Sequence, residues 1–383
     1  MTSSHWRPVL LLWLTGVIAA AALGKFASLG PLIVTDLHLS RVEAGWLVSL
    51  VEAGGASTGI VAGLLIARAG SRRALILGLA LLTFGGLLGA LIPGIPALFC
   101  ARLIEAFGYL MVVIAAPSLI NAVTPPQDQG AALSLWSTFV PAGFAISMSV
   151  SGLVAPMIGW RAALLIWAGL AACAAVAATR VPAVPSVPAK FAHSKFSWAP
   201  LPVWLLCAGF GLFALLFVGL IAMFPLFLTG LGTSPAVAAT ITAVASAATM
   251  AGAWIAARVL KQGDAARWAA LGAGLLLPAL LVCLVFAGHD ATLLSVLFIA
   301  LSAVSGIASS LFFARLPHMD ARLNVAAANG VLTQFGAGGS LIGPPTLAAV
   351  ADRWGWPAIG PAAVVCAVLS LLLVIAAERL ARR

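Results

Sequence analysis

Near its middle the chain reads Arg180-Val-Pro-Ala-Val-Pro-Ser-Val-Pro-Ala-Lys-Phe-Ala-His-Ser-Lys-Phe-Ser-Trp-Ala-Pro200. This is the longest polar stretch in the chain, and its prolines among small residues are typical of a semi-extended linker. Long apolar segments lie on both sides of it. We therefore predict an amino-terminal unit over 1–180, a linker over 181–200 and a carboxy-terminal unit over 201–383.

The apolar segments on either side are long enough to cross a membrane. Of the 383 residues, 63% are hydrophobic and 8% are charged, which is more apolar surface than a soluble core can bury. A spanning helix needs about 20 mainly apolar residues. Twelve segments meet this need, six in each unit: 9–35, 44–67, 74–92, 97–123, 131–156, 160–179, 201–229, 235–257, 267–288, 291–316, 323–351 and 356–378. The expected fold is an all-α membrane protein with twelve transmembrane helices in two six-helix bundles.

The positive charges support the count of twelve. If both termini are cytoplasmic, the cytoplasmic segments carry 15 of the 20 lysines and arginines, and the opposite side carries only Arg41, Arg161 and Arg353. One missed or extra helix would reverse every later loop and destroy this asymmetry. We expect a multi-pass protein of a bacterial-type inner membrane with cytoplasmic termini. The first apolar run imitates a secretory signal, but its length favours a retained first helix.

The two halves of the chain echo each other. Gly159-Trp160 and Gly355-Trp356 are 196 residues apart, and each pair follows a glycine-rich span. Self-similarity at an offset that agrees with the linker position indicates two related six-helix units, and hence a pseudo-two-fold axis.

The loop between the second and third spans carries a recognisable pattern. Five of its residues match a motif of Gly, Arg, Gly and basic positions: Gly63, Arg68, Gly70, Arg72 and Arg73. With its twelve spans and central linker, the whole chain resembles the major facilitator superfamily of secondary transporters. The resemblance implies two bundles that rock around a mid-membrane site, with this loop gating the cytoplasmic side. Ala67 stands where the family has an acid that latches the halves, so that latch is not expected here.

Four ionisable residues lie inside the predicted spans: Lys25, Glu52, Arg102 and Glu105. A charge at mid-membrane depth is costly unless it is paired or faces water. In a chain so poor in charge, these residues indicate a polar path for a solute, an ion or a proton.

Arg102, Glu105 and Tyr109 share one face of the fourth span, because their spacing is i, i+3, i+7. In the functional interpretation they line a cavity, where Arg102 attracts an anionic substrate group, Glu105 carries a proton and Tyr109 contacts the substrate. In the alternative interpretation, Arg102 and Glu105 form an internal ion pair that only fixes the helix.

Glu52 is a lone acid in the second span, and a buried lone acid can exchange a proton near neutral pH. It is therefore a second candidate for proton coupling. The alternative is an ion pair with Lys25 of the first span. Lys25 is itself a candidate to hold a substrate carboxylate, and alternatively its side chain extends to the outer interface.

The carboxy-terminal half offers amides in place of charges. Asn329 and Gln334 in the eleventh span are candidate substrate contacts because unpaired amides are costly in hydrocarbon, although hydrogen bonds between helices explain them equally well. Phe210, Phe213 and Phe217 have helical spacing that favours packing over a ligand wall. A site that is charged on one side and apolar on the other favours a small amphipathic solute, such as an organic anion.

Other classes of function lack their signatures. The sequence has no nucleotide-binding glycine loop, no cluster with metal-ligand spacing and no catalytic set, so we expect no enzyme activity, cofactor or metal. Its basic residues form short clusters between spans, which argues against a nucleic-acid partner. We predict a monomeric secondary active transporter that moves a small organic solute across the bilayer by alternating access, coupled to protons. Two alternatives stay open: a proton-antiport exporter of drugs or metabolites, and a membrane sensor or scaffold without transport.

Overall fold

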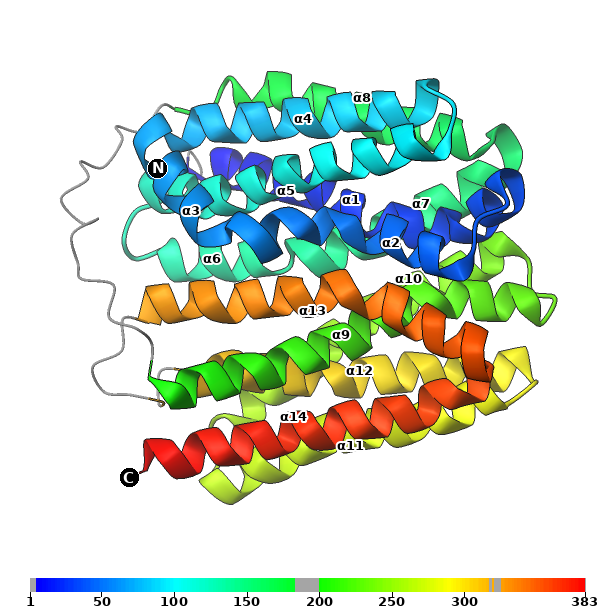
Figure 1. Ribbon diagram of the computed structural model, residues 1–383. Helices are drawn as coiled ribbons and strands as arrows, with labels where there is room; N and C mark the ends of the chain where they lie inside the picture. Colours follow the sequence, from blue (N-terminus) through cyan, green and yellow to red (C-terminus); the bar gives the residue numbers. More distant parts are fainter. Residues whose placement is uncertain (1–4, 183–199, 317–318, 320–324, 383) are drawn as a thin grey trace.

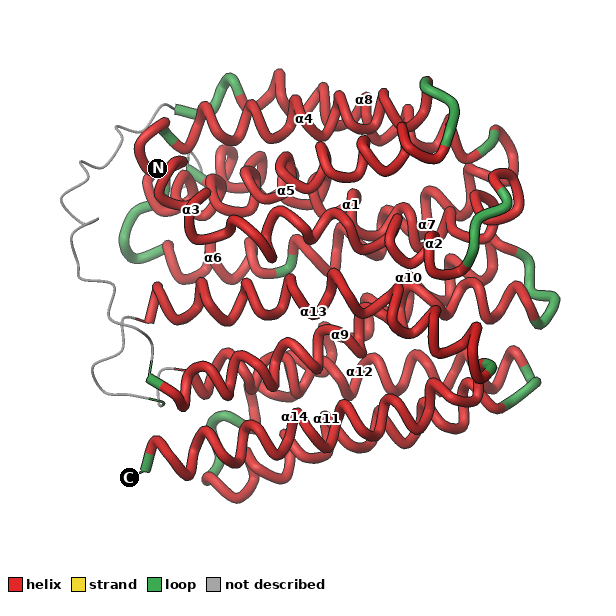
Figure 2. Tube along the Cα trace, viewed as in Figure 1, coloured by secondary structure: helices red, strands yellow, loops and turns green. Residues whose placement is uncertain are grey.

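The computed structural model describes residues 5–182, 200–316, 319 and 325–382, and every regular element in these ranges is a helix (Figures 1 and 2). The elements of the amino-terminal half are α1 (Trp6–Leu37), α2 (Arg41–Ser49), η1 (Leu50–Glu52), α3 (Ala53–Ala69), α4 (Ser71–Leu91), α5 (Ile95–Val123), α6 (Gln129–Ser137), α7 (Phe139–Ile158) and α8 (Trp160–Ala178). Those of the carboxy-terminal half are α9 (Leu201–Gly230), α10 (Pro235–Val259), α11 (Asp264–Ala287), α12 (Ala291–Arg315), α13 (Val325–Trp354), η4 (Trp356–Ala358) and α14 (Ile359–Ala381).

Helices occupy all twelve predicted spans. Ten helical segments in the described ranges are long and apolar enough to cross a membrane. The predicted span 44–67 is divided between α2, with 9 residues, and α3, with 17 residues, so neither piece reaches the full length. The predicted span 323–351 corresponds to α13, whose 30 residues are rich in glycine and include Pro344 and Pro345. The all-α twelve-span fold is therefore confirmed.

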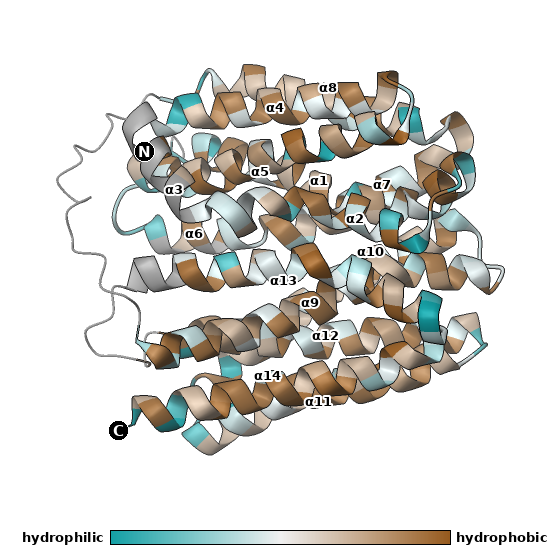
Figure 3. Cartoon of the chain, in the orientation of Figure 1, coloured by the Kyte–Doolittle hydropathy of each residue, from teal (hydrophilic) through white to brown (hydrophobic). Residues whose placement is uncertain are grey.

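The helices form two groups that follow the chain order. In the first, α1 packs on α7, and α4 packs on α5 and α8; in the second, α9 packs on α13 and α14, and α11 packs on α12 and α14. Figure 1 shows these groups one above the other, with both marked chain ends at the same end of the molecule. Hydrophobic residues run along the helices, and hydrophilic ones gather toward their ends (Figure 3). Most of the predicted linker, residues 183–199, lies outside the described part, so its role as a boundary stays a prediction.

The repeat between the halves is visible in the backbone. Gly159 and Gly355 both adopt a positive φ, of 88° and 81°, and each stands directly before a helical segment that starts with tryptophan. Positive φ is accessible to glycine without the strain that a Cβ would add. The glycine–tryptophan pairs noted in the sequence therefore mark equivalent turns in the two halves.

The two groups make their tightest contacts at the end away from the chain termini, which we call the outer end. There Arg41 of α2 pairs with Asp352 of α13 at 2.5 Å. A Cβ placed on Gly45 would lie 2.8 Å from the backbone nitrogen of Pro345, and one placed on Gly152 would lie 2.2 Å from the Cβ of Ala239. These contacts join α2 to α13 and α7 to α10, and they close the outer end.

Candidate functional site

Lys25, Arg102 and Glu105 form one buried charge cluster between α1 and α5. The Nζ of Lys25 donates to Glu105 Oε1 at 2.5 Å, and a guanidinium nitrogen of Arg102 donates to Glu105 Oε2 at 2.5 Å. Lys25 is 3% exposed, Glu105 1% and Arg102 0%. The predicted Arg102–Glu105 pair is present, but it is one part of a three-residue cluster that shares a single carboxylate. We call these residues the charge cluster.

Arg102 also binds three backbone carbonyls. It donates to the carbonyls of Ala22 in α1 and of Leu47 and Val48 in α2, at 2.8, 2.6 and 2.9 Å. The last carbonyls of a helix lack partners within that helix, and α2 ends at Ser49, just after Leu47 and Val48. Arg102 therefore caps the end of α2 from within the protein and ties α1, α2 and α5 together.

The charge cluster has more positive than negative charge. With all three groups ionised, two cations share one carboxylate, and no other carboxylate of the described residues pairs with them. The ring of Phe26 lies 4.4 Å from the Arg102 guanidinium carbon and 5.6 Å from the Lys25 nitrogen. An aromatic face attracts cations but supplies no full negative charge, so the cluster keeps an excess positive charge at mid-helix.

Glu52 lies at the break between α2 and α3, in the 3₁₀ turn η1. Its predicted alternative, an ion pair with Lys25, is wrong, because Lys25 is already bound to Glu105 across the α1–α5 contact. Lys25 likewise does not extend to the outer interface, as its 3% exposure shows. Glu52 is partly exposed and makes no hydrogen bond or ion pair with the described residues, yet it interacts electrostatically with Arg102. Of the two acids among the four predicted intramembrane residues, Glu52 is the one that lies outside the charge cluster.

Gln334 lies close to Glu52 from the opposite half of the molecule. Its amide nitrogen donates at 2.9 Å to the carbonyl of Ala56, which follows Glu52 by one helical turn in α3. Near the same point, a Cβ on Gly55 would lie 3.2 Å from the Cβ of Ala337 and 3.9 Å from Glu52 Oε2. Glu52 and Gln334 are therefore brought together at the α3–α13 contact between the halves. The hydrogen bond between helices that the sequence left open for Gln334 is present.

Two other predicted substrate contacts have different surroundings. Tyr109 of α5 is partly buried against the core of the first group and interacts electrostatically with Glu52. Asn329 lies in the first turns of α13, and its side chain is outside the described part of the chain. Tyr109 is therefore near the predicted path, whereas the role of the Asn329 amide stays a prediction.

The predicted gating loop forms the turn between α3 and α4. Gly70 has a φ of 94° and separates the two helices. Arg72 donates to the backbone carbonyl of Thr179 at the end of α8, and Arg73 is exposed. Gly63 and Arg68 belong to α3, but their surroundings are outside the described residues. The contact of Arg72 stays within the first half, so it does not latch the two halves together.

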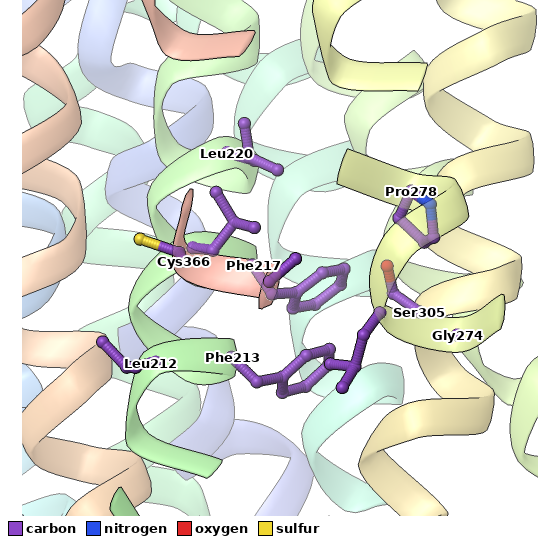
Figure 4. A pocket seen from close by; sticks show the side chains of 11 residues that line it. Leu212, Phe213, Phe217, Leu220, Gly274, Pro278, Ser305 and Cys366 are labelled. Atoms are coloured by element: carbon purple, nitrogen blue, oxygen red, sulfur yellow. The ribbon is translucent and has the colours of Figure 1, made fainter. Parts of the chain in front are cut away.

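The phenylalanine stripe of α9 packs, as its spacing predicts. Phe210 and Phe213 lie against Phe312 of α12, with ring centroids 5.4 and 6.0 Å apart. Phe213 and Phe217 also line a small, mainly apolar cavity between α9, α11, α12 and α14. Figure 4 shows their rings extending toward Pro278 and Ser305. This cavity lies within the second group and away from Glu52.

The sequence did not predict the break between α2 and α3 that positions Glu52. The turn at Leu50–Glu52 places Glu52 between α2 and α3, and the hydroxyl of the adjacent Ser49 is buried without a hydrogen-bond partner among the described residues. The signal in the sequence is the Gly54-Gly55 pair that follows, since a Cβ on Gly54 would lie 2.8 Å from the Ala106 carbonyl oxygen of α5. No group of three His, Cys, Asp or Glu side chains able to hold a metal ion occurs among the described residues.

Two groups of membrane-spanning helices, with ionisable side chains at mid-depth near their contact, define a polytopic protein of the transporter class. A sequence profile described as Major Facilitator Superfamily matches residues 12–319, and the chain belongs to this family. The resemblance read from the loop motif and the twelve spans is thereby confirmed.

Comparisons with individual proteins agree with this assignment. The chain is 28% identical over 377 residues to the uncharacterized transporter YycB of Bacillus subtilis (strain 168), covering 94% of this chain and 92% of that protein. Shorter matches are to the niacin transporter NiaP of Acinetobacter baylyi (28% over 159 residues, 41% of this chain and 36% of that protein) and to the hexuronate transporter of Bacillus subtilis (26% over 178 residues, 44% and 42%).

Solved structures show the same fold. A bacterial homologue of the human lysosomal transporter Spinster superposes with a TM-score of 0.73 at 17% identity, over 100% of this chain and 97% of that one. The nucleoside transporter NupG gives a TM-score of 0.71 at 16% identity, over 99% of this chain and 99% of that one. At these identities the likeness concerns the fold alone. The chain is therefore a multi-pass membrane protein with transporter relatives.

Proposed function

We propose that this protein is a secondary transporter that carries a small organic anion, a carboxylate, together with a proton. Glu52 binds the proton, and the excess positive charge of Lys25 and Arg102 attracts the carboxylate. The observation that carries the proposal is the arrangement of Glu52, which is unpaired with the described residues and partly exposed where α3 meets α13.

Charge balance gives the mechanism its order. When Glu52 is ionised, its negative charge offsets the excess positive charge of the buried cluster nearby. When Glu52 is protonated, that offset is lost, and a substrate carboxylate can take its place. Proton and anion then enter together, and neither state leaves a large net charge at mid-membrane depth, where an uncompensated charge is costly.

The other predicted residues have supporting roles in this proposal. Glu105 holds the two cations in place, because both of its oxygens are hydrogen-bonded within the cluster, and we assign the coupled proton to Glu52 in preference to Glu105. Gln334 and Tyr109 contribute polar groups to the path from opposite halves. The loop with Gly63, Arg68, Gly70, Arg72 and Arg73 supports rocking of the bundles, with Arg72 anchored to α8.

The relatives support a carboxylate. Niacin and hexuronates are both small carboxylic acids, and transporters named for them match parts of this chain. The excess positive charge in the first half fits such a group better than it fits a sugar or a cationic drug. The distribution of basic residues supports cytoplasmic termini in an inner membrane, and we place the outer end described above on the opposite face.

Purified protein and a matched pair of ligands test the substrate class. We expect nicotinate and glucuronate to raise the thermal unfolding temperature, whereas nicotinamide, the uncharged amide of nicotinate, leaves it unchanged. Binding of a ligand to the folded state alone stabilises that state by an amount that grows with ligand concentration over Kd. Equal stabilisation by nicotinate and nicotinamide would show that the protein does not recognise the carboxylate, and would contradict this part of the proposal.

Proteoliposomes then distinguish the direction of transport. Accumulation of labelled solute in vesicles that are acid outside and alkaline inside supports proton symport, and a protonophore should abolish it. Expulsion of solute under the same gradient would instead support the antiport exporter. Binding without any exchange of labelled for unlabelled solute would support the sensor or scaffold.

A further inference from the structure

A second charged cluster lies at the end of the molecule where the chain termini lie. It is formed by α11, α12 and α14 of the carboxy-terminal half and contains Asp264, Arg267, Arg315, Glu378 and Arg382. Arg315, the last residue of α12, pairs with Glu378 of α14, and Arg382 pairs with Asp264 of α11 at 3.1 Å. None of these residues takes part in the proposed transport site. We call this group the terminal cluster.

Arg315 is buried, yet it is only partly satisfied. The residue is 7% exposed, and its guanidinium carbon lies 4.1 Å from the centroid of the Trp268 ring. One of its terminal nitrogens pairs with Glu378, but its Nε and its other terminal nitrogen are buried and have no hydrogen-bond partner among the residues that the structure describes. A buried unsatisfied donor costs about 1–3 kcal/mol, and more when the group is charged. An acceptor from a bound anion would remove this cost.

Arg267 provides a further unsatisfied donor in the terminal cluster, close to Arg315. One of its terminal nitrogens donates to the backbone carbonyl of Leu260 at 2.6 Å, while its Nε is buried and has no hydrogen-bond partner in the described part of the chain. Arg267 and Arg382 both interact electrostatically with Arg315. Among the described residues, three arginines therefore face two carboxylates, and three guanidinium nitrogens on two of these arginines have no acceptor.

We propose that the terminal cluster binds the phosphate group of an anionic phospholipid. A phosphate oxygen accepts hydrogen bonds from several guanidinium groups at once, and arginine is suited to such forked contacts. One phosphodiester charge would neutralise the excess positive charge and satisfy the free donors of Arg267 and Arg315. Basic pockets between helices at the membrane surface are known to hold anionic headgroups.

The position of the cluster favours a lipid over free phosphate as the source of that group. α11 and α14 lie at the edge of the second helix group in Figure 1. The cluster sits where these helices end, next to the aromatic ring of Trp268, and aromatic rings of this kind are enriched at headgroup level. Leu380 of α14 is 37% exposed near the same end, which provides apolar surface for acyl chains.

The binding of short-chain lipids to the full-length protein in detergent tests the proposal. We expect dioctanoyl phosphatidylglycerol to raise the unfolding temperature more than dioctanoyl phosphatidylcholine or inorganic phosphate does. Arg267→Gln should weaken the apparent affinity for phosphatidylglycerol about tenfold, because it removes one charge and one free donor. The double variant Arg315→Gln/Glu378→Gln removes both members of the ion pair. A similar loss of affinity for phosphatidylglycerol in this variant would show that binding depends on Arg315 as well.

Arg180→Gln is the matched control, since Arg180 is exposed at the same end of the first half and its replacement removes an equal charge. It should leave lipid binding unchanged. Equal stabilisation of Arg267→Gln and wild-type protein by phosphatidylglycerol would overturn the proposal. Stabilisation by inorganic phosphate alone that is as strong as that by phosphatidylglycerol would overturn the assignment to a lipid. Each of the three variants is compared with its own unfolding temperature without lipid, so a general loss of stability does not imitate a loss of binding.

Discussion

Lys25 and Arg102 each bring one positive charge to Glu105, but only Arg102 binds the backbone as well. Replacing either by methionine leaves one cation paired with Glu105, so the two variants are matched in charge. Arg102→Met also removes the donors to the carbonyls of Ala22, Leu47 and Val48. Each buried carbonyl that loses its partner costs about 1–3 kcal/mol. We therefore expect Arg102→Met to destabilise the protein by about 3 kcal/mol or more, and Lys25→Met by about 1 kcal/mol.

Thermal unfolding in detergent, followed by intrinsic fluorescence, measures this difference. Nicotinate binding provides a second readout, because Lys25→Met removes the excess positive charge and should weaken binding of a carboxylate while the protein stays folded. Equal destabilisation by the two variants would show that Arg102 acts only as a counter-charge. Undiminished nicotinate binding by Lys25→Met would show that the excess charge does not attract the substrate.

At the scale of single helices, the outer closure depends on glycine in α2. A Cβ on Gly45 would lie 2.8 Å from the backbone of Pro344 and Pro345 in α13, where neither partner is a flexible side chain. Gly45→Ala should therefore separate α2 from α13 and cost the closed state about 1–3 kcal/mol. Gly59→Ala in α3 is the control, because no atom of the described residues lies within 4 Å of a Cβ placed there.

Spin labels on the exposed residues His38 and His289, at the outer ends of the two halves, report the separation. They require a background in which the five native cysteines are replaced by alanine. Gly45→Ala should shift the distance distribution toward longer values, and Gly59→Ala should match the unsubstituted protein. An unchanged distance distribution in Gly45→Ala would show that α2 and α13 can adjust locally without separating the two halves at the outer end.

The helices could be predicted from the sequence because spanning length and hydropathy are properties of contiguous residues. The pairing of Arg102 with Glu105 could be predicted for a similar reason, since an i, i+3 spacing fixes their face within one helix. The partner of Lys25 could not, because Glu52 and Glu105 lie on different helices and only packing decides which one it reaches. The break at Leu50–Glu52 could not be predicted from hydropathy either, since a short 3₁₀ turn leaves the apolar character of the span unchanged, and the Gly54-Gly55 pair is its one trace in the sequence.

At the scale of the whole molecule, the structure separates a fixed charge cluster from a free acid. Lys25, Arg102 and Glu105 hold the first half together and belong to α1 and α5, whereas Glu52 lies at the contact with the second half beside Gln334. Movement of the halves relative to each other would change the surroundings of Glu52 far more than those of the cluster. Coupling of a proton to alternating access therefore depends on Glu52 in this account.

The most direct measurement compares two kinds of transport in proteoliposomes containing Glu52→Gln. Exchange of labelled for unlabelled nicotinate needs no net proton movement and should persist, whereas accumulation driven by an acid-outside gradient should be lost. Glu43→Gln, the same change at an acid in the first turn of α2 at the outer end, should retain both activities. Gradient-driven accumulation by Glu52→Gln at the wild-type level would contradict the account, because another group would then be carrying the proton.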